Sequence, residues 1–188
     1  METITGKDGR SITVERMEAA VPVDEYIKNC VDIPKFLGYC KECSSYKNRW
    51  SCPPFEKDPM TIWTQYETIR LYGYVLPNEP GQSVAKALEN MEQAKDRLME
   101  ELLELERTIP GSFVLSCGMC RLCGDHCTRP EGKPCRMPEK MRHSIESLGG
   151  DVSKTAEVYL NKPMLWIKDG VLPDYLMLVG GLLRREEL

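Results

Sequence analysis

The stretch Glu67–Pro110, "ETIRLYGYVLPNEPGQSVAKALENMEQAKDRLMEELLELERTIP", contains the two strongest structural signals in the sequence. Its first part, Glu67–Leu76, is rich in β-branched and aromatic residues and stops before Pro77, which predicts a strand. After Gly81, apolar residues recur in steps of three or four, which predicts one face of a long helix. The apolar positions are Val84, Leu88, Met91, Ala94, Leu98, Leu102, Leu105 and Ile109.

Shorter signals lie on both sides of this stretch. Ser83 suits the N-cap of the long helix, and Pro110-Gly111 suits its end. Upstream, a strand followed by a short helix is expected near Val23–Asn29. Downstream, the expected elements are strands over Ser112–Ser116, Met164–Ile167 and Tyr175–Val179 and a helix over Val152–Leu160.

One further helix is expected to open at Pro138 and to end at Gly149-Gly150. Its buried face would carry Met141, Ile145 and Leu148, and His143 would lie on its surface. Together these elements predict an α+β fold, a two-layer sandwich with a mostly antiparallel sheet. The chain has 188 residues, so residues 1–188 are expected to form a single domain with the cysteine loops at the edge of the sheet.

Composition narrows the class of protein. Hydrophobic residues make up 41% of the chain, which is enough for a real core. The net charge of −4 implies no general attraction to nucleic acid or to an anionic membrane. The sequence shows neither a secretory signal nor an apolar run of about 18 to 20 residues. We therefore expect a cytoplasmic, reducing location, where clustered cysteines indicate metal binding or catalysis more often than disulfides.

Four of the nine cysteines lie in the eleven residues "CGMCRLCGDHC", Cys117–Cys127. Their spacing is C-x2-C-x2-C-x3-C, the run found in bacterial ferredoxins. Cysteines three residues apart in a tight loop can reach different irons of one cubane cluster, and the fourth can turn towards a second cluster. Cys135 follows shortly after and completes a cysteine loop over residues 117–136.

The second cysteine loop, residues 40–55, has the spacing Cys40-x2-Cys43-x8-Cys52 and continues with Pro53-Pro54. Cys30 lies outside both loops and is expected to be a small buried hydrophobic residue. Eight cysteines remain, enough for two [4Fe-4S] clusters. The candidate ligands are Cys40, Cys43, Cys52, Cys117, Cys120, Cys123, Cys127 and Cys135.

The spacing leaves the grouping of these ligands open. The preferred grouping places Cys117, Cys120, Cys123 and Cys135 on one cluster and Cys40, Cys43, Cys52 and Cys127 on the other. An alternative places Cys120, Cys123, Cys127 and Cys135 together and leaves Cys117 with the upstream loop or unused. If Cys40, Cys43 and Cys52 alone hold a cluster, its fourth iron could bind a substrate.

Zinc is the alternative metal, because paired C-x2-C motifs also form structural Zn²⁺ sites. Three cysteines at successive x2 intervals are crowded for one tetrahedral ion and natural for a cubane, which favours iron–sulfur clusters. The charge pattern agrees with an anionic centre. Residues 117–142 contain six basic and three acidic residues, a net of +3, and residues 40–57 contain four basic and two acidic, a net of +2. Such cations can tune a cluster potential, although solvated loops carry similar charges.

The motifs "RWSCPPF" and "EGKPCRMPEKMRHSIESLGGDV" resemble a cysteine-rich prokaryotic family of predicted metal-binding proteins, the domain of unknown function 2284. The resemblance extends from about Tyr39 to Val152. It implies metal ligation by Cys40, Cys43, Cys52, Cys120, Cys123, Cys127 and Cys135. Cys117 rests on the spacing alone.

Two functions follow as expectations. The first is an iron–sulfur protein of an anaerobe that transfers electrons to a redox partner protein or supports a reductive reaction on a small molecule. The second is a zinc-stabilised module that presents its loops to a binding partner. The residues identify no catalytic group, so whether the protein is an enzyme is left open.

Overall fold

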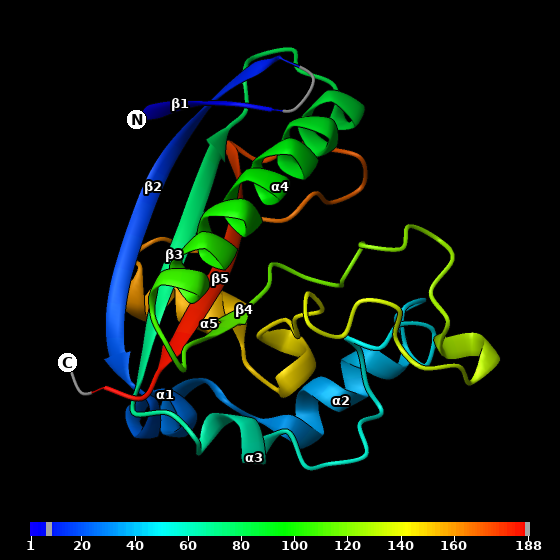
Figure 1. The fold of residues 1–188 in the computed structure, drawn as a ribbon. Helices are drawn as coiled ribbons and strands as arrows, with labels where there is room; N and C mark the ends of the chain where they lie inside the picture. The colour runs from blue at the N-terminus through cyan, green and yellow to red at the C-terminus, as the bar shows by residue number, and fades with distance from the viewer. Residues whose placement is uncertain (7–8, 187–188) are drawn as a thin grey trace.

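A computed structural model describes residues 1–6 and 9–186 and is built around one antiparallel sheet (Figure 1). The described strands follow the order β1-β2-β3-β5-β4 across the sheet. They are β1 (Glu2–Thr5), β2 (Ser11–Pro22), β3 (Thr68–Pro77), β4 (Phe113–Leu115) and β5 (Tyr175–Arg184). The predicted α+β class with an antiparallel sheet is confirmed.

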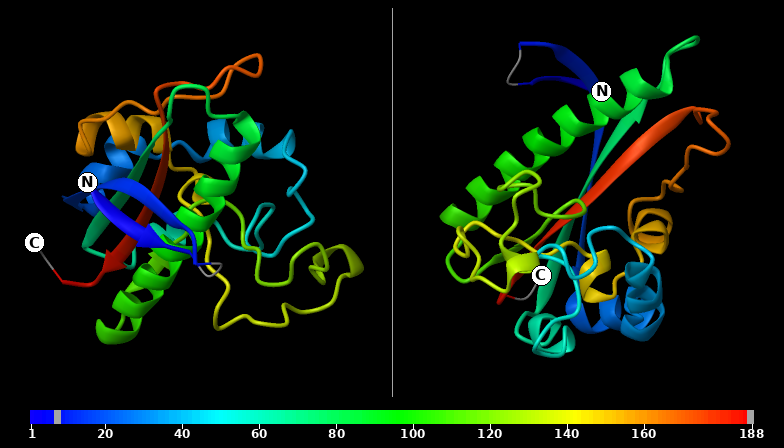
Figure 2. Two further views of the ribbon diagram at one scale, coloured as in Figure 1. Left: turned by 90° about the horizontal axis from the view of Figure 1, so that it is seen from above. Right: turned by 90° about the vertical axis from the view of Figure 1, so that its right-hand side faces the viewer.

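Strand β3 lies at the centre of the sheet and is buried on both faces, since its side chains alternate. Ile69 and Leu71 join a core with α1 (Val23–Cys30), α3 (Met60–Trp63) and α5 (Val152–Tyr159). Tyr72 and Tyr74 join a second core under α4 (Val84–Thr108). Helices therefore cover both faces of the sheet, as the right-hand view of Figure 2 shows. A further helix, α2 (Ile33–Lys41), leads into the first cysteine loop.

Helix α4 confirms the strongest prediction from the sequence. The hydroxyl of Ser83 accepts a hydrogen bond from the backbone N–H of Lys86 at 3.2 Å, as an N-cap should. Its buried face consists of Ala87, Ala94, Leu98 and Leu102. Leu88, expected on that face, is 41% exposed, because the first turn of the helix turns Ala87 inwards instead.

The prediction of a helix that begins at Pro138 is wrong. In its place the chain turns at Lys140 and forms only a 3-10 turn, η2 (Glu146–Leu148). The hydroxyls of Ser144 and Ser147 accept hydrogen bonds from each other's backbone N–H groups, at 3.2 and 3.1 Å, and so compete with helical bonding. Ile145 and Leu148 are nevertheless buried, because the turn itself packs on the core.

The strand expected over Met164–Ile167 is also wrong, since these residues have no β-ladder partner. Met164 packs against the core while Trp166 is 55% exposed, so the apolar run is explained by side-chain packing alone. The expected strand near Tyr175–Val179 is confirmed and extends to Arg184, where it pairs with both β3 and β4.

Glu106 fastens the end of α4 to β4 and to the segment after the second cysteine loop. Its Oε1 accepts from the backbone N–H of Val114 at 2.7 Å and from Arg142 Nε at 2.9 Å. Its Oε2 accepts from the same Nε at 3.0 Å and from Arg142 Nη2. The two side chains are only 14% and 13% exposed, so this is a largely desolvated, bidentate ion pair.

We expect Glu106→Gln to lower the free energy of unfolding by about 2 kcal/mol, because it leaves the Arg142 guanidinium largely buried without a counter-charge. The matched control is Glu104→Gln, which removes an exposed pair with Arg107 and should cost less than about 1 kcal/mol. Urea denaturation followed by tryptophan fluorescence measures both values. Equal losses of stability in the two variants would show that the buried ion pair of Glu106 and Arg142 contributes no more than an exposed pair.

None of the described helices combines the length and apolar character needed to cross a bilayer.

Candidate metal centre

The two cysteine loops, although distant in sequence, lie side by side (Figures 1 and 2) and are joined by hydrogen bonds. Cys40 lies in the last turn of α2, and Cys43 and Cys52 follow in the loop. The second loop leaves the end of β4, so Cys117 comes two residues after the strand. All nine cysteines are free thiols.

Two arginines hold the loops together in a reciprocal way. Arg49 of the first loop donates to the carbonyl oxygens of Cys120, at 3.5 Å, and Gly124 in the second loop. Arg129 of the second loop donates to three carbonyls of the first loop and lies over the Trp50 ring, with its guanidinium carbon 5.3 Å from the ring centroid. The three carbonyls belong to Arg49, at 2.6 Å, Cys52 and Pro54. Each loop therefore supplies the hydrogen-bond donors that the other needs.

Further contacts fix the register between the loops. The Ser51 hydroxyl accepts from the backbone N–H of Cys120 at 3.0 Å, and Trp50 Nε1 donates to the carbonyl of Lys133 at 3.1 Å. His143 Nδ1 lies 3.2 Å from the Ser51 carbonyl oxygen, and its ring meets Phe55 edge-on at 4.8 Å. Burial lowers the pKa of His143, so a neutral ring donates to this carbonyl from Nδ1. The expectation that His143 lies on the surface is wrong, because the loops enclose it.

Four thiols border one small cavity. Cys120, Cys123, Cys127 and Cys135 line a space of about 20 Å³ together with Trp50, Met137 and Met141. Burial raises the pKa of the Cys120 thiol, and the neighbouring thiols of Cys135, Cys123 and Cys127 add to the shift against an opposing backbone hydrogen bond from Leu122. Thiolates at this density need positive charge beside them, which a bound metal supplies as it displaces the protons.

The other three loop cysteines form a second group. Burial raises the pKa of Cys40 to about 11, and the thiols of Cys52 and Cys43 and the carboxylate of Glu146 contribute to the shift. Cys40 and Cys43 line a cavity of about 450 Å³, and Glu146 lies on its wall. Cys52 is 9% exposed and is adjacent in sequence to Ser51, which bonds to Cys120.

Cys117 lies apart from both groups. It is 5% exposed and belongs to the core under α4, near Leu98 and Leu102. The Cys117 sulfur packs closely against Gly180 of β5, where an added Cβ would lie only 3.0 Å from it. Burial raises the pKa of Cys117 to about 12. Cys117 therefore does not line the cavity that Cys120, Cys123, Cys127 and Cys135 border. Cys30 is buried in the other core, as expected.

The arrangement of the thiols bears on the choice between a single Zn²⁺ ion and an iron–sulfur cluster. Among the described residues, no three His, Cys, Asp or Glu side chains surround a position suited to a single metal ion. A tetrahedral Zn²⁺ site requires sulfurs only about 3.8 Å apart, given its Zn–S bond length of about 2.3 Å. The thiols here instead border cavities, and a buried carboxylate oxygen of Glu146 near Cys40 has no hydrogen-bond partner. Thiols are therefore the main metal-binding donors at these two cavities, with one carboxylate oxygen beside Cys40.

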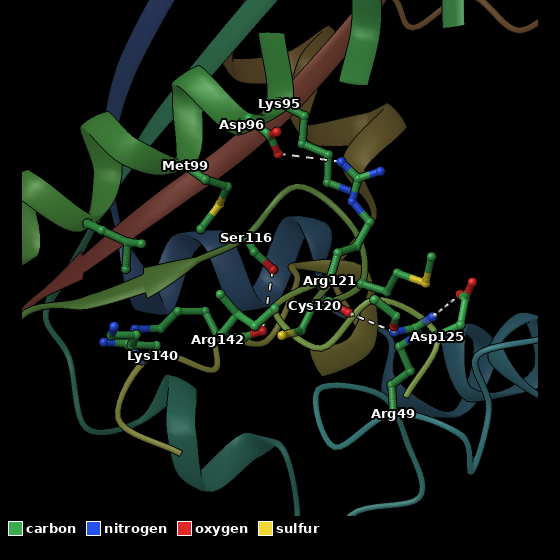
Figure 3. Close-up of a pocket in the computed structure, with 14 residues that line it drawn as sticks. Arg49, Lys95, Asp96, Met99, Ser116, Cys120, Arg121, Asp125, Lys140 and Arg142 are labelled. Atoms are coloured by element: carbon green, nitrogen blue, oxygen red, sulfur yellow. Dashed lines mark hydrogen bonds and ion pairs between the residues drawn. The ribbon is translucent and has the colours of Figure 1, made fainter. Parts of the chain in front are cut away.

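Cys120 also lines a second, larger cavity of about 590 Å³ between α4 and the second loop, and several cationic side chains line it too (Figure 3). Arg121 reaches across the cavity to Asp96 of α4 at 3.4 Å. Lys95 and Lys140 also line the cavity, and the charge of Lys95 acts on the buried groups of Cys117 and Glu146. The cationic residues of the lining are Arg49, Lys95, Arg121, Lys140 and Arg142, against Asp96 and Asp125. They favour negative charge beside Cys120.

Fold and site together define an α+β protein whose two cysteine loops converge into a thiol-rich centre. The chain belongs to the DUF2284 family, described as predicted metal-binding proteins, whose sequence pattern matches residues 28–183. The resemblance seen in the cysteine motifs is thereby confirmed, and the matched range contains every candidate ligand. The curated proteins and the solved structures contain no match to this chain.

Proposed function

We propose that this protein is an iron–sulfur protein with two [4Fe-4S] centres. Cys120, Cys123, Cys127 and Cys135 would hold the first, and Cys40, Cys43 and Cys52 would hold three irons of the second. The observation that carries this proposal is that four thiols line one cavity, while Cys40 and Cys43 line another and Cys52 lies close enough to raise the pKa of Cys40. Membership of a predicted metal-binding family supports it.

The residues around the thiols perform three tasks. Trp50, Met137 and Met141 exclude water from the four-thiol group, which lowers the local dielectric and makes each nearby charge count for more. Arg49 and Arg129 fix the backbone that carries the thiols. The cations of the neighbouring cavity, Lys95 and Lys140 among them, balance negative charge. When bound, iron–sulfur clusters supply one-electron transfer at potentials set by such surroundings.

Ser51 joins the two thiol groups directly. It is bonded covalently to Cys52 and accepts the 3.0 Å hydrogen bond from the N–H of Cys120. This short connection supports electron exchange between the two proposed centres. We infer that the chain passes electrons to a redox partner protein or to a small molecule in the cytoplasm of an anaerobe. Neither nucleic acid nor a membrane enters the proposal.

Anaerobic purification with metal and sulfide analysis tests the proposal. We expect brown protein with broad absorption near about 400 nm and about eight irons per chain, matched by acid-labile sulfide. Colourless protein that contains zinc and no labile sulfide would refute iron–sulfur chemistry. It would favour the zinc-stabilised module instead, and chelator-driven unfolding would then follow zinc release.

A further inference from the structure

The carboxylate of Glu146 is unusual for its burial. Glu146 begins η2, and its Oε2 is closed to solvent without a hydrogen-bond partner. Burial raises the pKa of this carboxyl group. An unpaired oxygen in such a place costs about 1–3 kcal/mol, so a ligand that bonds to it would stabilise the folded protein.

Close packing of η2 against α2 places this carboxylate beside Cys40 and Cys43. The backbone N–H of Asp32, at the start of α2, donates to the carbonyl of Gly149 at 2.8 Å. Gly149 has a φ of 89°, and a Cβ there would lie 2.7 Å from the Cα of Ile33, so only glycine allows η2 to come this close to α2. Glu146 consequently lies on the wall of the same cavity as Cys40 and Cys43.

The three-thiol group lacks a fourth donor from the cysteines. Cys127 borders the other cavity, and Cys117 is buried in the core under α4. Asp151 also lies on the wall of the Cys40 cavity, but its carboxylate is already engaged. It accepts from the backbone N–H of Lys154 at 3.0 Å, as the cap of α5, and pairs with Lys35 at 3.4 Å. The Glu146 carboxyl group also accepts hydrogen bonds, from the Ser144 side chain and from its own backbone N–H, and the charge of Lys95 acts on it. Its Oε2, however, has no hydrogen-bond partner.

We propose that Glu146 is the fourth protein donor, through a carboxylate oxygen, at the metal centre of Cys40, Cys43 and Cys52. The inference rests on the proposed function for the identity of the metal. Iron is held less firmly by a carboxylate than by a thiolate, because soft sulfur ligands suit iron–sulfur clusters better. One iron would therefore be more easily exchanged than the others. The cavity of about 450 Å³ beside it, lined by Phe36, Tyr39 and Trp166, leaves room for an external ligand to displace the carboxylate.

The test compares Glu146→Leu, Glu146→Cys and a control, Glu157→Leu, which alters an exposed glutamate of α5. Each anaerobically purified protein is treated with ferricyanide and a chelator, so that a labile site gives up one Fe²⁺ to the chelator and one electron to ferricyanide. We expect Glu146→Leu to lose about one iron per chain at least tenfold faster than the wild type and to show the paramagnetic signal of a three-iron cluster. Glu146→Cys should lose that iron more slowly than the wild type.

An unchanged rate of iron loss and an unchanged spectrum in both Glu146 variants would overturn the proposal. Glu146→Cys keeps the test decisive if Glu146→Leu does not fold, since it still supplies a donor. Failure of the proposed function is separately visible, because the wild type would then contain no labile sulfide. If the wild type holds zinc, Glu146→Leu should lower the zinc content by about one ion per chain, and full retention would count against Glu146 as a donor.

Discussion

Replacing Arg129 by lysine is expected to strip most of the metal from both centres while the sheet and α4 remain folded. The guanidinium donates to three carbonyls of the first loop and lies over Trp50. A lysine has no planar fork and cannot serve these acceptors together. In the proposed arrangement Cys52 holds one centre and Cys127, two residues before Arg129, holds the other, so loosening this contact should disturb both.

Metal and sulfide content per chain measures the effect, with far-UV circular dichroism as the check on folding. We expect metal affinity to fall by about tenfold or more, the range found when groups that orient metal ligands are removed. The matched control is Arg121→Lys, because Arg121 pairs with the carboxylates of Glu92 and Asp96 and a point charge can replace it there. Full metal content in Arg129→Lys would show that the loops do not depend on this arginine.

Replacement by alanine is expected to lower the metal content at Cys123 and the stability at Cys117. Cys123→Ala should remove about half of the iron and sulfide, because it takes one thiol from the four-thiol group. Cys117→Ala should keep all of the iron but lower the free energy of unfolding by about 1–2 kcal/mol, since it leaves a small void under α4.

Metal analysis and urea denaturation of the two variants decide the grouping of the thiols. Cys30→Ala serves as the control for a buried cysteine outside the loops and should behave like Cys117→Ala. Loss of a cluster from Cys117→Ala would restore the grouping of Cys117 with Cys120, Cys123 and Cys135. It would require the second loop to rearrange around Gly118 when metal binds.

The sequence predictions failed where side chains compete with the backbone. Residues 138–148 have helical spacing of apolar residues, yet Ser144 and Ser147 bond to local backbone groups and η2 is the only helical turn there. The same change places His143 between the loops instead of on a helix surface. The sequence analysis did not single out Glu146, although its position between the apolar residues Ile145 and Leu148 was a usable signal of burial.

The roles of Arg49 and Arg129 were equally hidden. In the sequence they appear only as part of the basic excess of the cysteine loops. In the structure, their guanidinium groups are the donors that join the loops, and their acceptors lie 71 to 80 residues away along the chain. Counting charges finds such residues, but it does not distinguish an arginine that joins two loops from a solvated surface charge.

The sequence by itself determined helix α4, strand β3 and the set of candidate thiols. Helical periodicity, strand propensity, the Ser83 cap and ligand spacing are all properties of neighbouring residues, so they can be read without a fold. Only the tertiary structure showed which thiols line the same cavity and that Cys117 belongs to the core. Both depend on hydrogen bonds and packing between segments far apart in the chain, and those contacts exist only once the two cysteine loops have come together.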